Sequence, residues 1–248
     1  MRTVTATRYV TPLREGGALP AIVEADDDGL YVLKFRGAGQ GPKALVAELV
    51  AGEIARALGL LVPDIVFATL DAELARTEPD PEIQDLIRAS EGLNLAIDYL
   101  PGSVTFDLAA QQPDADLAST IVWLDALTVN VDRTARNTNM LVWHKRIWVI
   151  DHGAALYVHH APGDFRARAR SPFPQIKDHV LLPYASRLGE LDAELAARLT
   201  PEIVRDITAL IPVEWLGEDL RAVYADYLLA RLEAPRSFVE EARDARSR

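Results

Sequence analysis

The segment that decides the fold is Val129-Asn130-Val131-Asp132-Arg133-Thr134-Ala135-Arg136-Asn137-Thr138-Asn139. Two short apolar strands joined by a tight turn follow it, and Asp151-His152-Gly153 comes directly after the second strand. Because paired strands place such residues at neighbouring ends of one hairpin, we expect Asn137 and Asp151 to lie close together, with Asp132 beside them. The sequence therefore predicts a cluster of two carboxylates and one amide.

These are the groups that phosphoryl transfer requires. A carboxylate accepts the proton of the attacking hydroxyl, and oxygen ligands hold the magnesium ion that bridges the ATP phosphates. One Asp and one Asn suffice, since Mg²⁺ keeps water and phosphate among its ligands. Taken singly, Asp132 and Asp151 are each better explained as caps or turn residues, and only their combination favours a site.

Composition excludes several other classes of protein. Hydrophobic residues make up 49% of the 248 residues, so most of the chain is expected to bury a core. The net charge of −11 argues against a protein that binds nucleic-acid backbones. The absence of cysteine excludes disulfides, thiolate metal sites and cysteine nucleophiles. With no signal peptide and no apolar run long enough to span a membrane, we expect a cytoplasmic protein.

The order of predicted elements indicates an α+β fold with two lobes. The first lobe, residues 1–98, is expected to hold a small antiparallel β-sheet and one helix, and the second, residues 99–248, to be mostly helical. The predicted strands are 3–10, 19–24, 31–35, 65–70, 93–98, 140–143 and 147–150, and the predicted helices are 43–58, 116–131, 190–199, 201–210 and 216–232, with short helix and loop at 73–90.

Lys34 stands out because the chain has only four lysines and this one lies in an apolar strand, Tyr31-Val32-Leu33-Lys34-Phe35. A strand lysine can place a point charge on phosphates, although a lysine at a sheet edge with its head in water is the plain alternative. A carboxylate on the following helix would hold it. By helical phase Glu53 points inward and Glu48 outward, and the residues alone leave the choice open.

On these residues the chain resembles the HipA-like kinases, a branch of the protein-kinase-like superfamily with motifs similar to those of phosphatidylinositol kinases. The resemblance runs from about Val4 to Asp151. It is carried by residues 31–35, the helix and turn 47–63, Asn130-Val131-Asp132-Arg133 with Asn137, and Ile150-Asp151-His152-Gly153. It implies a bilobal protein-kinase-like fold and an enzyme that uses ATP and Mg²⁺.

The resemblance also implies roles for individual residues. Asp132 would be the catalytic base, Asn137 and Asp151 would bind magnesium, and Lys34 would contact the α- and β-phosphates. The family glutamate lies 11 residues before the Gly-Leu-x-Val-Pro turn, which favours Glu48.

Further nucleotide contacts are implied at two backbone segments. The loop that covers the phosphates would contain Gly16 and Gly17. The hinge that meets adenine would be Asp98, Tyr99 and Leu100. Arg133 stands where many relatives have histidine, and it is expected to stabilise the transferred charge.

The resemblance suggests serine or threonine of a protein as the hydroxyl acceptor. A small-molecule or lipid-headgroup acceptor is the alternative, and a nucleotide-binding pseudokinase scaffold is the alternative of another class. Two further motifs have plain interpretations. One is the arginine run Arg166, Arg168 and Arg170. It could contact an acidic substrate, but a solvated loop is the favoured interpretation. His159 and His160 with His152 do not have the spacing of a metal site.

Overall fold

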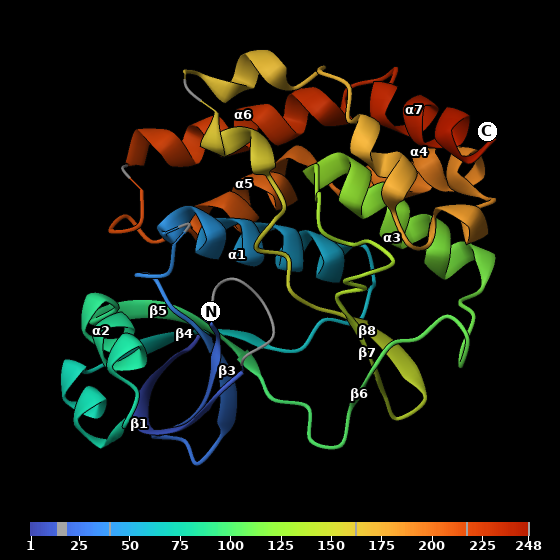
Figure 1. Ribbon diagram of the computed structural model, residues 1–248. Helices are drawn as coiled ribbons and strands as arrows, with labels where there is room; N and C mark the ends of the chain where they lie inside the picture. The colour runs from blue at the N-terminus through green and yellow to red at the C-terminus, as the bar shows by residue number, and fades with distance from the viewer. Residues whose placement is uncertain (14–18, 40, 162, 217, 248) are drawn as a thin grey trace. The chain divides into compact units, whose positions relative to one another are not determined.

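In the computed structural model, which describes residues 1–13, 19–39, 41–161, 163–216 and 218–247, the chain folds into two units. The first unit comprises residues 1–49 and 63–101, and the second comprises 50–62 and 102–248. Figure 1 shows the elements of each unit.

The strands of the first unit form a closed barrel in the order β1-β2-β3-β5-β4. The neighbours are antiparallel except β1 and β4, which run parallel with Thr3 opposite Phe67. The expected antiparallel pairing is present in four of the five described strand pairs, but the expectation of an open sheet is corrected, because the parallel β1–β4 pair joins the two edges and closes a barrel. The strands are β1 (Thr3–Pro12), β2 (Ala21–Ala25), β3 (Leu30–Lys34), β4 (Ile65–Leu70) and β5 (Gly92–Asp98).

Small and branched side chains fill the barrel. Alternate residues of β2, which are Ala21, Val23 and Ala25, are buried, as expected for a strand with one face toward a core. The same core includes residues of the 3₁₀-helix η1 (Ala72–Thr77) and of helix α2 (Pro81–Ala89), so both elements pack on the barrel. Aspartate side chains cap the two helices at their N-termini.

Helix α1 (Pro42–Ala57) is largely buried, and each residue from 45 to 52 is buried. Glu48, with 1% of its surface exposed, is among them. A helix that is covered all round has no single inward face, so the helical-phase argument that placed Glu48 outward fails.

In the second unit, α3 (Ala115–Thr128) is the most deeply buried helix, and every residue from 121 to 128 is buried. It packs against α4 (Leu188–Arg198), α6 (Glu218–Leu232) and α7 (Ser237–Arg246), while α5 (Pro201–Ala209) packs on α6. The indole of Trp123 donates to Asp192 at 2.9 Å and meets the Phe238 ring edge to face.

The C-terminal helices predicted from periodicity are present as α4, α5 and α6, and Thr200 caps α5 as its sequence indicates. Helix α3 ends at Thr128, three residues earlier than predicted, because Val129 adopts a left-handed conformation with φ of 54°. Short 3₁₀-helices connect the sheet to α4, and they are η2 (Tyr157–His160), η3 (Phe165–Arg168), η4 (Pro174–Asp178) and η5 (Leu182–Tyr184).

A small antiparallel sheet supports the segment that opened the sequence analysis. Its order is β6 (Val104–Thr105), β7 (Met140–Trp143) and β8 (Arg146–Val149). His144 and Lys145 form the β7–β8 turn with φ of 48° and 63°, the geometry of a two-residue hairpin turn. The predicted hairpin is confirmed.

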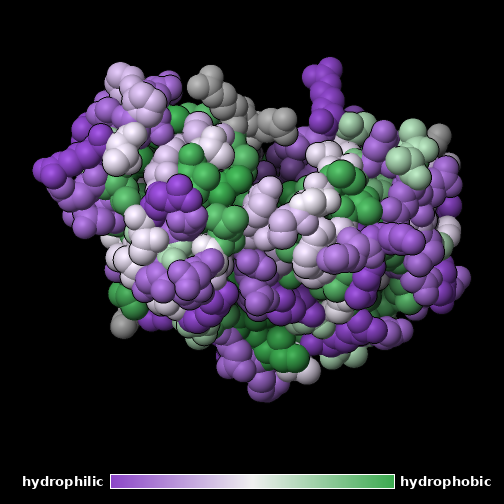
Figure 2. Space-filling view, turned by 90° about the horizontal axis from the view of Figure 1, so that it is seen from below, coloured by the Kyte–Doolittle hydropathy of each residue, from purple (hydrophilic) through white to green (hydrophobic). Residues whose placement is uncertain are grey.

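Among the described residues, no helix combines the length and the apolar character that a membrane span requires. On the face in Figure 2, hydrophobic residues are interrupted by hydrophilic ones. Such interspersed apolar residues are normal for a protein surface and need no partner.

A buried arginine holds the C-terminal end of α3. The guanidinium of Arg231 donates to the carbonyl oxygens of Leu127 at 2.7 Å, Ala126 at 2.7 Å and Ala169 at 2.8 Å. Its burial lowers the pKa of Arg231. One side chain thus satisfies the last carbonyls of α3 and binds them to the η3 region.

Replacing this side chain should destabilise the protein strongly. We expect Arg231→Met to lower the free energy of unfolding by about 3 kcal/mol or more, because three buried carbonyls lose their donor. Urea denaturation followed by circular dichroism measures the change. The matched control is Arg170→Met, an exposed arginine whose loss should change stability by less than about 0.5 kcal/mol. Equal stabilities of the two variants would contradict the assigned role.

Candidate active site

Lys34, at the end of β3, forms an ion pair with Glu48 of α1. The Nζ and Oε2 atoms are 3.6 Å apart, and the side chains are only 12% and 2% exposed. Glu53 instead pairs with Arg56 on its own helix at 3.4 Å. Within the first unit the structure therefore places Glu48, not Glu53, beside the lysine.

The predicted hinge follows β5. The N–H of Asp98 donates to Asp64 and that of Tyr99 to Leu30, at 2.8 and 3.0 Å, so both groups are used within the unit. Among the described residues the backbone N–H of Leu100 has no such partner. Burial, together with the nearby Asp64 carboxylate, raises the pKa of Asp98. Gly16 and Gly17, the predicted phosphate-covering glycines, lie outside the described residues.

The Asp132 carboxylate is held by two amides in the second unit. Its Oδ2 atom accepts hydrogen bonds from the side chains of Asn137 at 2.8 Å and Asn139 at 3.3 Å. Its backbone N–H donates to the side chain of Asn130. Among the described residues none donates a hydrogen bond to Oδ1. The structure thus brings Asp132 and Asn137 into direct contact.

Asp151 reaches the same region through the β7–β8 hairpin. The N–H of Ile150 donates a hydrogen bond to the carbonyl oxygen of Asn139. Asn139 belongs to the loop of residues 129–139, called the Asp132 loop below, and Asp151 is the residue after Ile150. Val129, Asn139 and Asp151 all have φ near +50°. Such conformations cost about 1–3 kcal/mol each and gather where a site requires them.

The donor set fits a magnesium ion. The Asn137 side chain turns its NH₂ group toward Asp132, which directs its carbonyl oxygen away from that carboxylate. The Asn137 carbonyl and the Asp151 carboxylate both carry oxygen donors of the hard kind that Mg²⁺ takes. Among the described residues no three His, Asp or Glu side chains form a metal cluster, so an ion here needs phosphate or water oxygens as well.

Arg133 is not directed to solvent. Its guanidinium is fully buried and pairs with the equally buried carboxylate of Asp125 at 2.5 Å. It also donates to the carbonyl of Asn139 and lies 3.2 Å from Nδ1 of His152. Contact with a transferred phosphoryl group would require this network to open. The placement therefore fits a positioning role better than the catalytic one expected from the sequence.

Asp125 joins the Asp132 loop to a distant segment. Besides Arg133 it accepts hydrogen bonds from Asn130 at 3.0 Å and from Nε2 of His179 at 2.8 Å. The Nδ1 atom of His179 accepts from the N–H of Leu181, so Nε2 carries the proton of the neutral ring. Burial alone would raise the pKa of Asp125, but the Arg133 charge and the His179 hydrogen bond lower it overall.

The three histidines named in the sequence do not gather. His152 lies against Arg133, whereas Nε2 of His159 faces Nε2 of His160 at 3.1 Å and its Nδ1 faces the Tyr224 hydroxyl.

Comparison with known proteins identifies the family. A model of the HipA-like kinases matches residues 7–235, which is most of the chain. The chain belongs to the HipA-like kinase family. This HipA-like protein is therefore a phosphotransferase by class, as the resemblance in its motifs implied. No curated protein sequence matches it.

Solved structures show the same fold. The proinflammatory kinase CtkA of Helicobacter pylori aligns with a TM-score of 0.55 and 14% identity, over 99% of this chain and 97% of CtkA. The Golgi casein kinase with Mn and ADP bound aligns with a TM-score of 0.54 and 14% identity, over 99% of this chain and 75% of that one. At this identity the likeness shows a kinase-like fold.

The lysine pair of this HipA-like protein gives a direct prediction. Glu48→Gln should weaken nucleotide binding by about tenfold, because the amide no longer fixes the Lys34 charge. Glu53→Gln, on the same helix, should leave binding unchanged. Calorimetric titration with a non-hydrolysable ATP analogue measures both affinities. A larger loss of affinity in Glu53→Gln than in Glu48→Gln would contradict the assignment of Glu48 as the partner of Lys34.

Proposed function

We propose that the protein transfers the γ-phosphoryl group of ATP, with Mg²⁺, to the hydroxyl of a serine or threonine in a protein. The observation that carries this proposal is the Asp132 carboxylate, held by two amides at Oδ2 and left open at Oδ1. We further propose that residues 1–98 act as the N-lobe and 99–248 as the C-lobe of one bilobal kinase domain. The Mn and ADP bound to the Golgi casein kinase support the use of a nucleotide and a divalent cation.

Each residue has a stated task in this reaction. Lys34, held by Glu48, places its charge on the α- and β-phosphates, and the hinge at Asp98, Tyr99 and Leu100 meets adenine through its backbone.

Asn137 and Asp151 would hold Mg²⁺, which when bound neutralises charge on the phosphate oxygens. Arg133 keeps the Asp132 loop in place through its buried contacts with Asp125 and with the carbonyl oxygen of Asn139.

The transfer step itself depends on Asp132. The acceptor oxygen forms a bond to the γ-phosphorus while the bond from that phosphorus to the β–γ bridging oxygen breaks and ADP leaves. The hydroxyl proton passes to Oδ1 of Asp132. Oδ2 stays bound to the amides of Asn137 and Asn139, which fixes the orientation of the carboxylate during the transfer.

The proposal is tested by following the label of γ-labelled ATP. The purified protein with Mg²⁺ is incubated alone and with a lysate of its own cells, beside Asp132→Asn, and protein, lipid and small-molecule fractions are separated. Asp132-dependent label on serine or threonine in the protein fraction is the expected result. Label only in another fraction would assign a lipid or small-molecule acceptor. ATP binding without label in any fraction would identify a pseudokinase scaffold.

The metal residues are tested separately. Asp151→Ala should abolish the part of nucleotide affinity that depends on Mg²⁺ and leave the affinity measured in EDTA unchanged, because it removes one metal ligand. Titrating a fluorescent ATP analogue with and without Mg²⁺ separates the two quantities. The exposed Asp85, replaced by Ala, is the control. A Mg²⁺ effect of normal size in Asp151→Ala would remove this residue from the site.

A further inference from the structure

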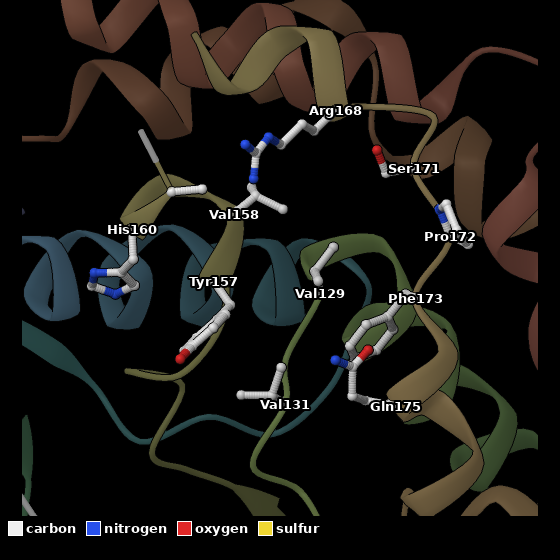
Figure 3. A pocket seen from close by; sticks show the side chains of 11 residues that line it. Val129, Val131, Tyr157, Val158, His160, Arg168, Ser171, Pro172, Phe173 and Gln175 are labelled. Atoms are coloured by element: carbon white, nitrogen blue, oxygen red, sulfur yellow. The ribbon is translucent and has the colours of Figure 1, made fainter. Parts of the chain in front are cut away.

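A pocket of about 550 Å³ lies beside the Asp132 loop, entirely within the second unit. Val129 and Val131, which shortly precede Asp132, line part of it, and residues of the segment after Asp151 line the rest. Figure 3 shows Tyr157, Arg168 and Phe173 around this space. A volume of this size accommodates a small ligand or a few side chains of a peptide.

The walls of the pocket are mainly apolar. Two of its lining residues, Val129 and Phe173, are buried, with 8% and 3% of their surfaces exposed. Tyr157, by contrast, is 51% exposed, so the pocket opens to solvent at this residue. An open, apolar-walled pocket next to a proposed base admits a segment of polypeptide.

The charge of the pocket comes from one of the three arginines in the run noted in the sequence. Arg166 pairs with Asp164 and Asp226, and Arg170 pairs with Glu233. Arg168 lines the pocket, and Figure 3 shows its side chain extending into it.

Within the described part of the chain, the guanidinium of Arg168 has no ion-pair or hydrogen-bond partner. No Asp or Glu is present among the residues that line the pocket. In a protein with a net charge of −11 this is a local positive site.

We infer that this pocket binds the acceptor segment, and that Arg168 recognises a carboxylate carried by an Asp or Glu close to the phosphorylated hydroxyl. The inference rests on the proposed function and specifies its substrate class, an acidic peptide. A guanidinium binds a carboxylate through two parallel hydrogen bonds, which selects for charge and for position along the peptide. The preferred interpretation of the arginine run as a solvated loop then holds for Arg166 and Arg170 and not for Arg168.

The test uses peptides with one serine whose neighbours are Glu, Gln or Lys. For the wild-type protein, kcat/KM should be about tenfold higher with Glu than with Gln. Arg168→Gln should remove this preference, so that its kcat/KM is the same for the Glu peptide and the Gln peptide. Arg168→Glu should favour the Lys peptide. Arg170→Gln, the matched control two residues away, should keep the wild-type preference.

Binding provides a readout that does not require turnover. Fluorescence anisotropy with the Glu peptide, its serine replaced by alanine, should show weaker binding to Arg168→Gln than to Arg170→Gln. Phosphorylation of all peptides with an Arg168-independent preference would overturn the inference and leave the proposed function intact. Absence of phosphorylation on every peptide, with label on small molecules only, would overturn both.

Discussion

Asp132→Asn is expected to lower the rate of γ-phosphoryl transfer by about 10²–10⁴, the usual contribution of a positioned general base. Asparagine keeps an oxygen that the amides of Asn137 and Asn139 can use, so the loop should remain folded. It removes the carboxylate oxygen that we propose takes the proton. The affinity for Mg²⁺ and ATP should change by less than threefold, because Asp132 is not among the proposed metal ligands. Single-turnover rates and calorimetric titration measure the two effects.

One comparison makes this result specific. Asp85→Asn, an exposed carboxylate on α2, should have the wild-type rate. A transfer rate within threefold of the wild type would exclude Asp132 from the proposed role.

Asp125→Ala should have the largest effect on stability, lowering the free energy of unfolding by about 3–5 kcal/mol. The substitution leaves the Arg133 charge buried without its counterion. It also removes the acceptor of Asn130 and His179, so the Asp132 loop loses its anchor. Asp116→Ala is the control on the same helix, since its exposed carboxylate pairs only at the surface. Equal urea midpoints for the two variants would contradict the assignment.

The stability that Asp125 provides should depend on pH with a defined sign. The pKa of Asp125 in the folded protein lies below the ordinary value for an aspartate, so its contribution to stability is present above that ordinary value and is lost as pH falls through the folded pKa. The difference in unfolding free energy between the wild type and Asp125→Asn should thus be constant from about pH 7 to pH 5. It should narrow only in strongly acidic solution. A difference that narrowed above pH 5 would contradict the assigned pKa direction.

Local sequence patterns predicted the main helices and strands, and they also pointed to most of the residues of the candidate site. Alternating strands, the β7–β8 turn and the cap at Thr200 depend on neighbours in the chain, and each appeared where the sequence indicated. The barrel could not be predicted because its closure pairs β1 with β4, some sixty residues away, and parallel pairing leaves no local pattern.

The missed positioning residues had a weak signal. Asp125 is the one charge in the otherwise apolar helical run Ile121–Leu127, and a lone carboxylate there must be paired or metal-bound. The identity of its partners depended on the tertiary fold, because His179 lies 54 residues away. The direction of the Arg133 side chain also depends on the tertiary fold. Its position in the sequence does not reveal that the side chain turns toward Asp125, so the sequence placed it at the phosphoryl group instead.

The contact between Arg231 and Ala126 spans 105 residues and has a consequence for biosynthesis. At about 5–20 residues per second, translation completes that contact several seconds after α3 has been made. A nascent chain that ends before α6 already contains every candidate catalytic residue, but the helix that leads to Asp132 still lacks the cap at its C-terminal end. Completion of the C-terminal end of α3 is thereby tied to the synthesis of α6.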